Sequence, residues 1–306
     1  MSLLDVPNYH LFGLRLRVPF ALPLTPESAT GQPDYLVDWP GSCAPIPACA
    51  SPQRGYRWNV LPDGWSLGFE DTTGHWNKFR LWLAKRRIEV EGSTPEHDLG
   101  GLLLGPIIAT LIYSLGYPVW HGTTLSLSGR AITLAGASGR GKSTLAVALL
   151  QRGLSLVSDD LTVTKNGRVI PGYPLLRLTQ QAAMKLTGTD ASPRVFSPGS
   201  GDDKRWLNVT HLRGGFSSDM QPLQAIYILG RRKGHKTVIT PLVRSQAVAA
   251  LMSTRFTPRW ITRIPANDWA ACAGLAERVS VKMLEMPDSL TALPVVVDTL
   301  LDDAVG

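Results

Sequence analysis

The stretch Gly136-Ala137-Ser138-Gly139-Arg140-Gly141-Lys142-Ser143 matches the pattern G-x-x-x-x-G-K-[ST] at every fixed position. An apolar strand predicted over residues 130–135 runs into this stretch, and a helix predicted over 142–152 follows it and ends at Gly153. Glycines let successive backbone N–H groups point at phosphate oxygens, and the helix adds its positive dipole end. The stretch therefore predicts a loop that binds the phosphates of a nucleotide. The alternative is a glycine-rich turn that contains Gly-Lys-Ser by chance.

Each residue of this loop has an expected role. The Lys142 ammonium should reach the β- and γ-phosphates, and the Ser143 hydroxyl should coordinate Mg²⁺. Residues in contact with the nucleotide are expected to be Gly136, Ala137, Ser138, Gly139, Arg140, Gly141, Lys142, Ser143 and Thr144. The loop thus predicts ATP and Mg²⁺ as ligands.

Two adjacent carboxylates, Asp159 and Asp160, follow the apolar strand predicted over residues 154–157. A strand that ends in a carboxylate is how P-loop proteins supply a second magnesium contact. Adjacent strand side chains point to opposite faces, so one carboxylate can hold the metal while the other accepts a proton from a hydroxyl. Which aspartate does which stays open. The alternative is a solvated pair that opens the turn to Leu161.

Length and composition restrict the class of protein. The chain has 306 residues, of which 44% are hydrophobic and 18% charged, enough for two globular domains of roughly 100–200 residues each. This balance excludes a disordered tail, a fibrous repeat and a coiled coil. Three cysteines are too few for a disulfide framework, which favours free thiols in a reducing, cytoplasmic setting.

The net charge of +7 is unevenly distributed along the chain. Residues 1–98 contain 9 Lys/Arg and 11 Asp/Glu, whereas residues 99–306 contain 22 and 13. The second part should therefore attract anions such as nucleotide phosphates or acidic peptides. Without a long basic run or a nucleic-acid motif, binding to nucleic acid is not expected.

Residues 99–120 contain no formally charged side chain and are long enough to span a bilayer. Pro106 and four glycines interrupt the stretch, and no cluster of Lys or Arg flanks it. We therefore expect a buried helix that begins near Pro106, with the proline in its first turn, and stops near Gly116. A membrane span is the disfavoured alternative.

The pattern of apolar residues divides the chain into a β-rich N-terminal domain, residues 1–98, and an α/β domain, residues 99–306. In the first, two-residue alternation such as Phe79, Leu81 and Leu83 predicts strands, and the Pro- and Gly-rich residues 40–62 predict a loop. In the second, hairpins are predicted over residues 123–135 and 161–170. Further strands are predicted over 223–229 and 237–242, and further helices over 246–255, 267–277 and 289–301.

The segment that begins at His121-Gly122 and continues through the hairpin into GASGRGKSTLAVALLQRGLSLVSDD closely resembles the kinase domain of HPr kinase/phosphorylase. The chain also resembles the shorter HPr-kinase-like proteins associated with lasso-peptide biosynthesis. The specific match covers residues 119–178, and a looser one extends over 100–301. Two features depart from the bifunctional enzymes: their glycine-rich signature after the paired aspartates is not apparent, and Thr144 replaces the usual acidic residue.

This resemblance implies a P-loop kinase fold of HPr kinase type, a mixed sheet with flanking helices, preceded by a small β-rich domain. It implies that Asp159 and Asp160 supply the base and a metal contact, and that His121 beside them orients an aspartate or contacts phosphate. It also implies a second cation that stabilises the transferred phosphoryl group. The candidates for this phosphate clamp are Lys204, Arg205 and Arg213, for each of which a solvated surface charge is the alternative.

The function expected from these features is transfer of the γ-phosphoryl group of ATP to a Ser/Thr-type hydroxyl of a peptide or small protein. The resemblance favours a lasso-peptide precursor as the acceptor. Two other functions are compatible with the same motifs: a nucleotide-gated regulatory protein without transfer, and a kinase for a small-molecule hydroxyl. The motifs leave open whether the protein forms a homo-oligomer.

Overall fold

A computed structural model describes residues 6–27, 31–39, 56–70, 76–92, 96–188, 204–230, 236–258 and 266–305. The chain forms two compact units, Met1–Gly116 with Pro193–Lys204, and Tyr117–Ser192 with Arg205–Gly306. The sequence analysis placed the domain boundary at residue 98. In the structure, the helical segment before Gly116 lies in the first unit and not in the second.

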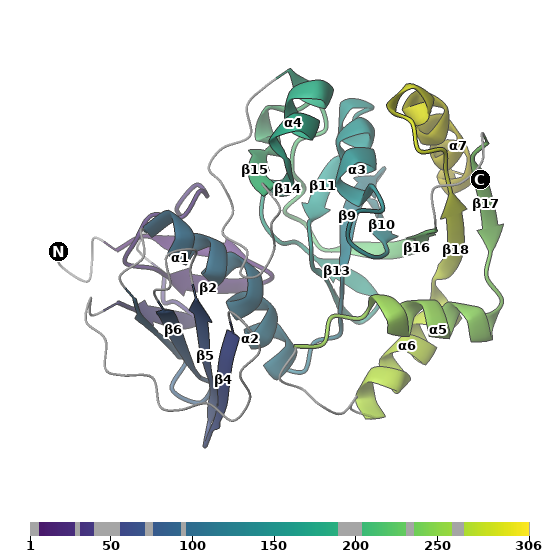
Figure 1. The fold of residues 1–306 in the computed structure, drawn as a ribbon. Coiled ribbons are helices and arrows are strands. Elements are labelled where there is room, and N and C mark those ends of the chain that lie inside the picture. The colour runs from purple at the N-terminus through teal and green to yellow at the C-terminus, as the bar shows by residue number, and fades with distance from the viewer. Residues whose placement is uncertain are drawn as a thin grey trace. The chain divides into compact units, whose positions relative to one another are not determined.

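The first unit is built on a sheet that has seven strands among the described residues, in the order β1-β2-β3-β7-β6-β5-β4 (Figure 1). Its strands are β1 (Asn8–Leu11), β2 (Leu14–Arg17), β3 (Tyr35–Asp38), β4 (Tyr56–Leu61), β5 (Gly64–Glu70), β6 (Trp76–Trp82) and β7 (Arg87–Glu91). β4 lies in the stretch expected to be a loop, of which residues 40–55 lie outside the described part. The β-rich character of this unit is confirmed.

One face of this sheet is apolar, as the alternation predicts. Phe79 and Leu81 of β6 are fully buried, as is Ile88 of β7. Three helical segments follow the sheet: α1 (Glu96–Leu102), the π-helical η1 (Leu103–Ile107) and α2 (Ile108–Ser114). Trp65 of β5 donates from Nε1 to the Ser114 hydroxyl at 3.0 Å, so the sheet and the end of α2 belong to the same unit.

The position predicted for Pro106 is wrong. The helical run begins ten residues before the proline, which lies inside η1. A proline inside an α-helix removes a hydrogen bond and clashes with the preceding turn. The wider π-turn at this point accommodates it without ending the run. The segment is buried, as expected, and no helix among the described residues is long and apolar enough to cross a membrane.

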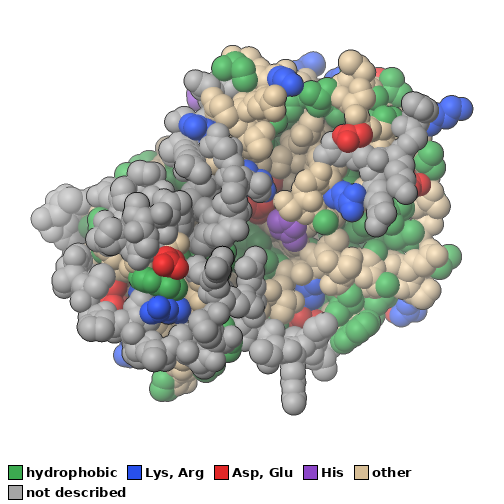
Figure 2. Space-filling view, in the orientation of Figure 1, with side chains coloured by type: hydrophobic (Ala, Val, Ile, Leu, Met, Phe, Trp, Pro, Cys, Tyr) green, Lys and Arg blue, Asp and Glu red, His purple; other side chains and the backbone are tan. Residues whose placement is uncertain are grey.

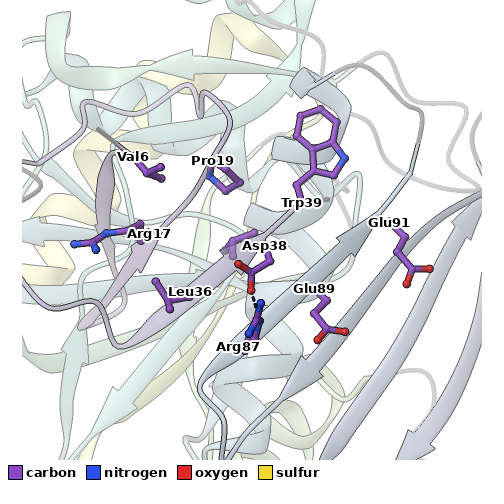
Figure 3. A pocket seen from close by; sticks show the side chains of 10 residues that line it. Val6, Arg17, Pro19, Leu36, Asp38, Trp39, Arg87, Glu89 and Glu91 are labelled. Atoms are coloured by element: carbon purple, nitrogen blue, oxygen red, sulfur yellow. Dashed lines mark ion pairs between the residues drawn. The ribbon is translucent and has the colours of Figure 1, made fainter. Parts of the chain in front are cut away.

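The first unit also contains a pocket of about 420 Å³ on one side of β3 and β7 (Figure 3). It is lined by Val6, Arg17, Pro19, Leu36, Val37, Asp38, Trp39, Arg87, Glu89 and Glu91. The strand register pairs Leu36 with Arg87 and Asp38 with Glu89, which brings these side chains to one face. Arg87 forms an ion pair with Asp38 across the two strands. The pocket therefore combines apolar walls with charged side chains, of which Asp38 and Arg87 pair with each other.

The second unit contains a mixed sheet with helices on both faces and a separate sheet of two strands, residues 175–179 and 204–208, which confirms the predicted α/β class. Its strands are β8 (Val119–Trp120), β9 (Gly122–Leu127), β10 (Arg130–Ala135), β11 (Ser155–Ser158), β12 (Thr162–Lys165), β13 (Arg168–Ile170), β14 (Leu175–Thr179), β15 (Lys204–Asn208), β16 (Gln221–Leu229), β17 (Val238–Pro241) and β18 (Ser280–Glu285). Its helices are α3 (Lys142–Gln151), α4 (Gln180–Thr187), η2 (Val209–His211), α5 (Arg244–Thr254), α6 (Ala266–Arg278), η3 (Leu290–Ala292) and α7 (Leu293–Val305). Both predicted hairpins are present, as β9–β10 and β12–β13.

Strand β10 lies at the centre of this unit and is buried on both faces. Ile132 and Leu134 pack in the core beneath α3 and α7, whereas Ala131 and Ala135 pack in a second core beneath α5 and α6 (Figure 1). Successive residues of a strand face opposite sides, so a strand between two helical layers must be apolar on both. Its central position places the loop that follows it at the middle of one sheet edge.

On the face shown in Figure 2, the described Lys and Arg side chains of the second unit are dispersed among apolar and polar ones. The basic excess expected from the sequence therefore does not gather into one patch in that view.

Candidate functional site

Three neighbouring strands bring the motif residues to one edge of the sheet. β9 runs antiparallel to both β10 and β11, pairing Gly122 with Ala135 and Thr124 with Ser158. The start of β9 therefore lies beside the ends of β10 and β11. As a result, His121, the glycine-rich loop and the paired aspartates, which precede or follow these strand ends, meet at the same edge.

The glycine-rich loop has the backbone conformations that its sequence predicts. The φ angles of Gly136, Gly139 and Gly141 are 144°, 78° and 91°, values that residues other than glycine rarely adopt. At Gly136 a Cβ atom would also lie 3.1 Å from the Leu229 carbonyl oxygen. Gly141 is the N-cap of α3, and it has no side chain to occupy the first N–H groups of the helix. This end of α3 is therefore suited to an anion.

Lys142 opens α3 and folds back over the loop. Its side chain is buried, and Nζ donates to the carbonyl oxygens of Gly136 at 2.7 Å and Ala137 at 3.2 Å. These contacts hold a positive charge within the loop that the phosphates would enter. Ser143 and Thr144 lie half-buried in the first turn of α3, while Ala137 and Ser138 are exposed and Arg140 is half-buried.

Asp159 is the buried member of the carboxylate pair, with 3% of its surface exposed. Its Oδ1 accepts from the Thr123 hydroxyl at 2.6 Å, and its Oδ2 accepts from the Arg177 backbone N–H at 2.7 Å. Burial, followed by the charge of Asp160, raises the pKa of Asp159 to about 6, against the hydrogen bonds from the Arg177 backbone, the Thr123 hydroxyl and the Asp160 backbone that lower it. A carboxylate with this pKa is suited to accepting a proton near neutral pH.

Asp160 has a different environment and a strained backbone. Its φ is 62°, in the left-handed region that aspartate tolerates better than most residues. Its Oδ2 accepts from Arg177 Nη1 at 2.6 Å, and its side chain is 27% exposed. Non-glycine residues in this conformation often occur at functional sites. The turn thus directs the two carboxylates into different surroundings.

His121 is held between helix α5 and the turn that contains Asp159 and Asp160, here called the aspartate turn. Its Nδ1 lies 3.0 Å from the backbone carbonyl oxygen of Asp160, and its backbone N–H donates to the Thr254 carbonyl at 2.7 Å. Because a carbonyl oxygen only accepts, Nδ1 carries the hydrogen in this contact. His121 therefore braces the main chain of the aspartate turn.

The His-Gly pair has a steric explanation. At Gly122 a Cβ atom would lie 2.9 Å from Thr133 Cγ2 and 3.0 Å from Thr162 Oγ1. Both threonine hydroxyls bond to Thr124 at 2.9 Å, in a buried cluster between the strands. The strands can approach this closely only with glycine at position 122.

We expect Gly122→Ala to destabilise the protein by about 1–3 kcal/mol, because the added methyl group overpacks the threonine cluster. The measurement is the free energy of unfolding in urea. Ser126→Ala, at a half-buried position of the same strand, is the control and should change stability by less than about 0.5 kcal/mol. Equal stability of the Gly122 and Ser126 variants would contradict the steric explanation.

The residues expected to form a phosphate clamp fall in two places, with Lys204 and Arg205 adjacent on β15 and Arg213 elsewhere. Arg213 lies near the C-terminal end of α3, where its Nε is 3.8 Å from the Cβ position of Gly153. A ten-residue helix is about 15 Å long, so this position is remote from the loop at the other end. Lys204 belongs to the first unit and Arg205 to the second. Arg205 lies on β15, the neighbour of β14.

The sequence interpretation missed Arg177, Thr123 and Tyr173. Arg177 stands between Leu176 and Leu178 in the apolar strand β14, and a cation in such a strand is a recognisable signal. Tyr173 is buried, and burial followed by the charge of Asp160 raises the pKa of its phenol. Thr123 carried no signal of its own beyond its place after His-Gly.

A glycine-rich loop between a strand and a helix, with a buried lysine and a carboxylate pair at the same sheet edge, is the arrangement typical of P-loop nucleotide-binding proteins. Over part of its length, the chain resembles HPr kinase/phosphorylase, as the motifs predict. It is 43% identical over 49 residues to the HPr kinase/phosphorylase of Chlorobaculum tepidum. The match covers 16% of this chain and 14% of that relative's length.

No family model matches the chain. The HPr(Ser) kinase/phosphatase from Coxiella burnetii is a structural match with a TM-score of 0.30 and 15% identity, which covers 60% of this chain and 94% of that one.

Proposed function

We propose that the protein transfers the γ-phosphoryl group of ATP to a Ser/Thr-type hydroxyl of a peptide or small protein. The observation that supports this most directly is the buried Asp159 carboxylate at the same sheet edge as the phosphate-binding loop. A binding protein without transfer has no need for a buried proton acceptor beside its nucleotide. The resemblance to the lasso-peptide-associated proteins makes a lasso-peptide precursor the acceptor that we favour.

The residues present fit a magnesium ion. The Ser143 hydroxyl and the Asp160 carboxylate are the oxygen ligands that Mg²⁺ prefers. Among the described residues, no three or more His, Cys, Asp or Glu side chains are grouped so that they could hold a metal ion, so phosphate and water oxygens would have to supply the other ligands. When bound, Mg²⁺ would neutralise charge on the phosphates.

The chain's own residues would act as follows. The loop from Gly136 to Ser143 surrounds the phosphates with N–H groups, and Lys142 supplies a fixed positive charge. Asp159 accepts the proton of the acceptor hydroxyl. The hydroxyl oxygen bonds to the γ-phosphorus as the bond between that phosphorus and the oxygen that leaves with ADP breaks. Thr123 and the Arg177 N–H hold the Asp159 carboxylate in place, and His121 holds the turn.

The test is intact-mass spectrometry of a lasso-type precursor peptide, and separately of HPr, after incubation with the protein, ATP and Mg²⁺. We expect a phosphoryl mass gain on the peptide, located by fragmentation, and none with Lys142→Ala. A gain on HPr alone would replace the acceptor that we favour. Bound ATP without transfer to either acceptor would favour a nucleotide-gated regulator or a small-molecule kinase.

The pH dependence of transfer should follow the protonation of Asp159. Because the carboxylate is the active form, the rate should rise as pH increases through about 6. Thr123→Val removes a hydrogen bond that lowers the pKa of Asp159. The rising limb of the curve of rate against pH should therefore move to higher pH, by about one unit. Single-turnover rates between pH 5 and 9 measure this shift.

Thr123→Ser is the matched control, because it keeps the hydroxyl and should leave the limb where it is in the wild type. A limb that stays in place or moves to lower pH in Thr123→Val would show that Asp159 is not the titrating base.

A further inference from the structure

Arg177 holds both carboxylates of the site, each through a different group. Its backbone N–H donates to Asp159 at 2.7 Å, and its guanidinium Nη1 donates to Asp160 at 2.6 Å. Substitution of the side chain leaves the backbone N–H in place. An Arg177 variant therefore changes the partner of Asp160 while it preserves the contact to Asp159.

The ion pair between Arg177 and Asp160 lies at the boundary of the interior. The exposed fraction is 15% for the Arg177 side chain and 27% for that of Asp160. A guanidinium at this depth needs a compensating anion, and Asp160 supplies it. Asp160 is still accessible enough to exchange its partner, whereas Asp159 is enclosed.

The proposed function assigns a second cation to the same carboxylate. Magnesium and the guanidinium would compete for Asp160, because each is stabilised by the negative charge of one side chain. On the basis of that function, we propose that Arg177 is a positioning residue, which acts as the counter-cation of Asp160 until nucleotide binds. The guanidinium is then replaced by magnesium at Asp160. Arg177 therefore sets the metal concentration at which the site binds magnesium.

The experiment measures binding of Mn²⁺, a spectroscopic substitute for Mg²⁺, in the presence of ADP by electron paramagnetic resonance. Removal of the competing charge in Arg177→Met should tighten Mn²⁺ binding by about threefold to tenfold, equivalent to about 0.7–1.4 kcal/mol. Arg177→Gln, which is also uncharged, should tighten it as well. Arg177→Lys keeps a cation and should bind Mn²⁺ like the wild type.

A merely structural role predicts the opposite result, with weaker metal binding in Arg177→Met and partial rescue by Gln and Lys alike. Unchanged or weaker Mn²⁺ binding in the folded Met and Gln variants would overturn the proposal. Arg152→Met is the control. It removes an arginine at the C-terminal end of α3 whose side chain is 44% exposed and pairs with Asp298, and it should leave Mn²⁺ binding unchanged. Thermal unfolding establishes that each variant is folded.

A double-mutant cycle tests the assigned partner. Asp160→Asn removes the carboxylate for which Arg177 and the metal ion compete. In that background, Arg177→Met should leave Mn²⁺ affinity unchanged within about twofold. A full effect in that background would place the competition elsewhere and overturn the proposal. If the wild type binds no Mn²⁺ with ADP, the proposed function itself fails, which distinguishes that failure from an absent Arg177 effect alone.

Discussion

Lys142→Ala is expected to lower the rate of phosphoryl transfer by about a hundredfold to a thousandfold, the usual effect of removing one fixed donor from a transition-state site. Lys142 is the buried cation of the loop, and its Nζ lies 2.7 Å from the Gly136 carbonyl. Without it, the N–H groups alone face the phosphates. Single-turnover transfer to the acceptor peptide at saturating ATP measures the effect.

ATP binding should weaken in the same variant, since the ammonium also stabilises the bound phosphates. Lys165→Ala removes an exposed lysine from β12 and is the control, with an expected change in rate of less than twofold. Unchanged turnover in Lys142→Ala would show that the loop is a glycine-rich turn without a role in transfer.

Asp159→Asn is expected to reduce transfer by about a hundredfold to ten-thousandfold, the range for loss of a general base. The amide cannot accept the hydroxyl proton at neutral pH. Nucleotide affinity should stay within about threefold of the wild type, because Asp159 is directed at Thr123 and the Arg177 N–H. The two quantities are measured separately, by single-turnover kinetics and by calorimetric titration with ADP and Mg²⁺.

Asp160→Asn should show the complementary behaviour, a higher Mg²⁺ requirement. Asp298→Asn replaces an exposed carboxylate of α7 and should change neither quantity. An amide at position 159 has one oxygen in place of two and can accept from either the Arg177 N–H or the Thr123 hydroxyl but not from both in the wild-type way, so thermal unfolding must accompany the kinetics. A folded Asp159→Asn protein that transfers phosphate at the wild-type rate would remove Asp159 from the mechanism.

The motif residues could be located from the sequence because each depends on its immediate neighbours. The loop needs a strand before it, glycines within it and a helix after it, and all are contiguous from β10 to α3. The aspartate pair ends the next strand. Gly122 was found only by resemblance, and the structure supplies its reason in the contacts to Thr133 and Thr162.

One sequence prediction failed where a local rule met a tertiary constraint. The rule that proline belongs in the first turn of a helix placed the helix start at Pro106, whereas a π-turn accommodates the proline inside a longer run. The pattern of apolar residues suggested a domain boundary at residue 98; the compact units divide at Gly116, and the contact between Trp65 and Ser114 lies within the first of them.

By itself the sequence determined the glycine-rich loop between a strand and a helix, the position of the carboxylate pair at a strand end and the α/β class, because short-range periodicity and backbone geometry suffice to specify them. Only the tertiary structure decided which neighbours these groups have. Arg177 and Thr123 reach Asp159 from positions 18 and 36 residues away in the chain, through strand order and register. Sheet register depends on packing across the whole domain, so the environment that separates Asp159 from Asp160 could not be derived from either residue's own segment.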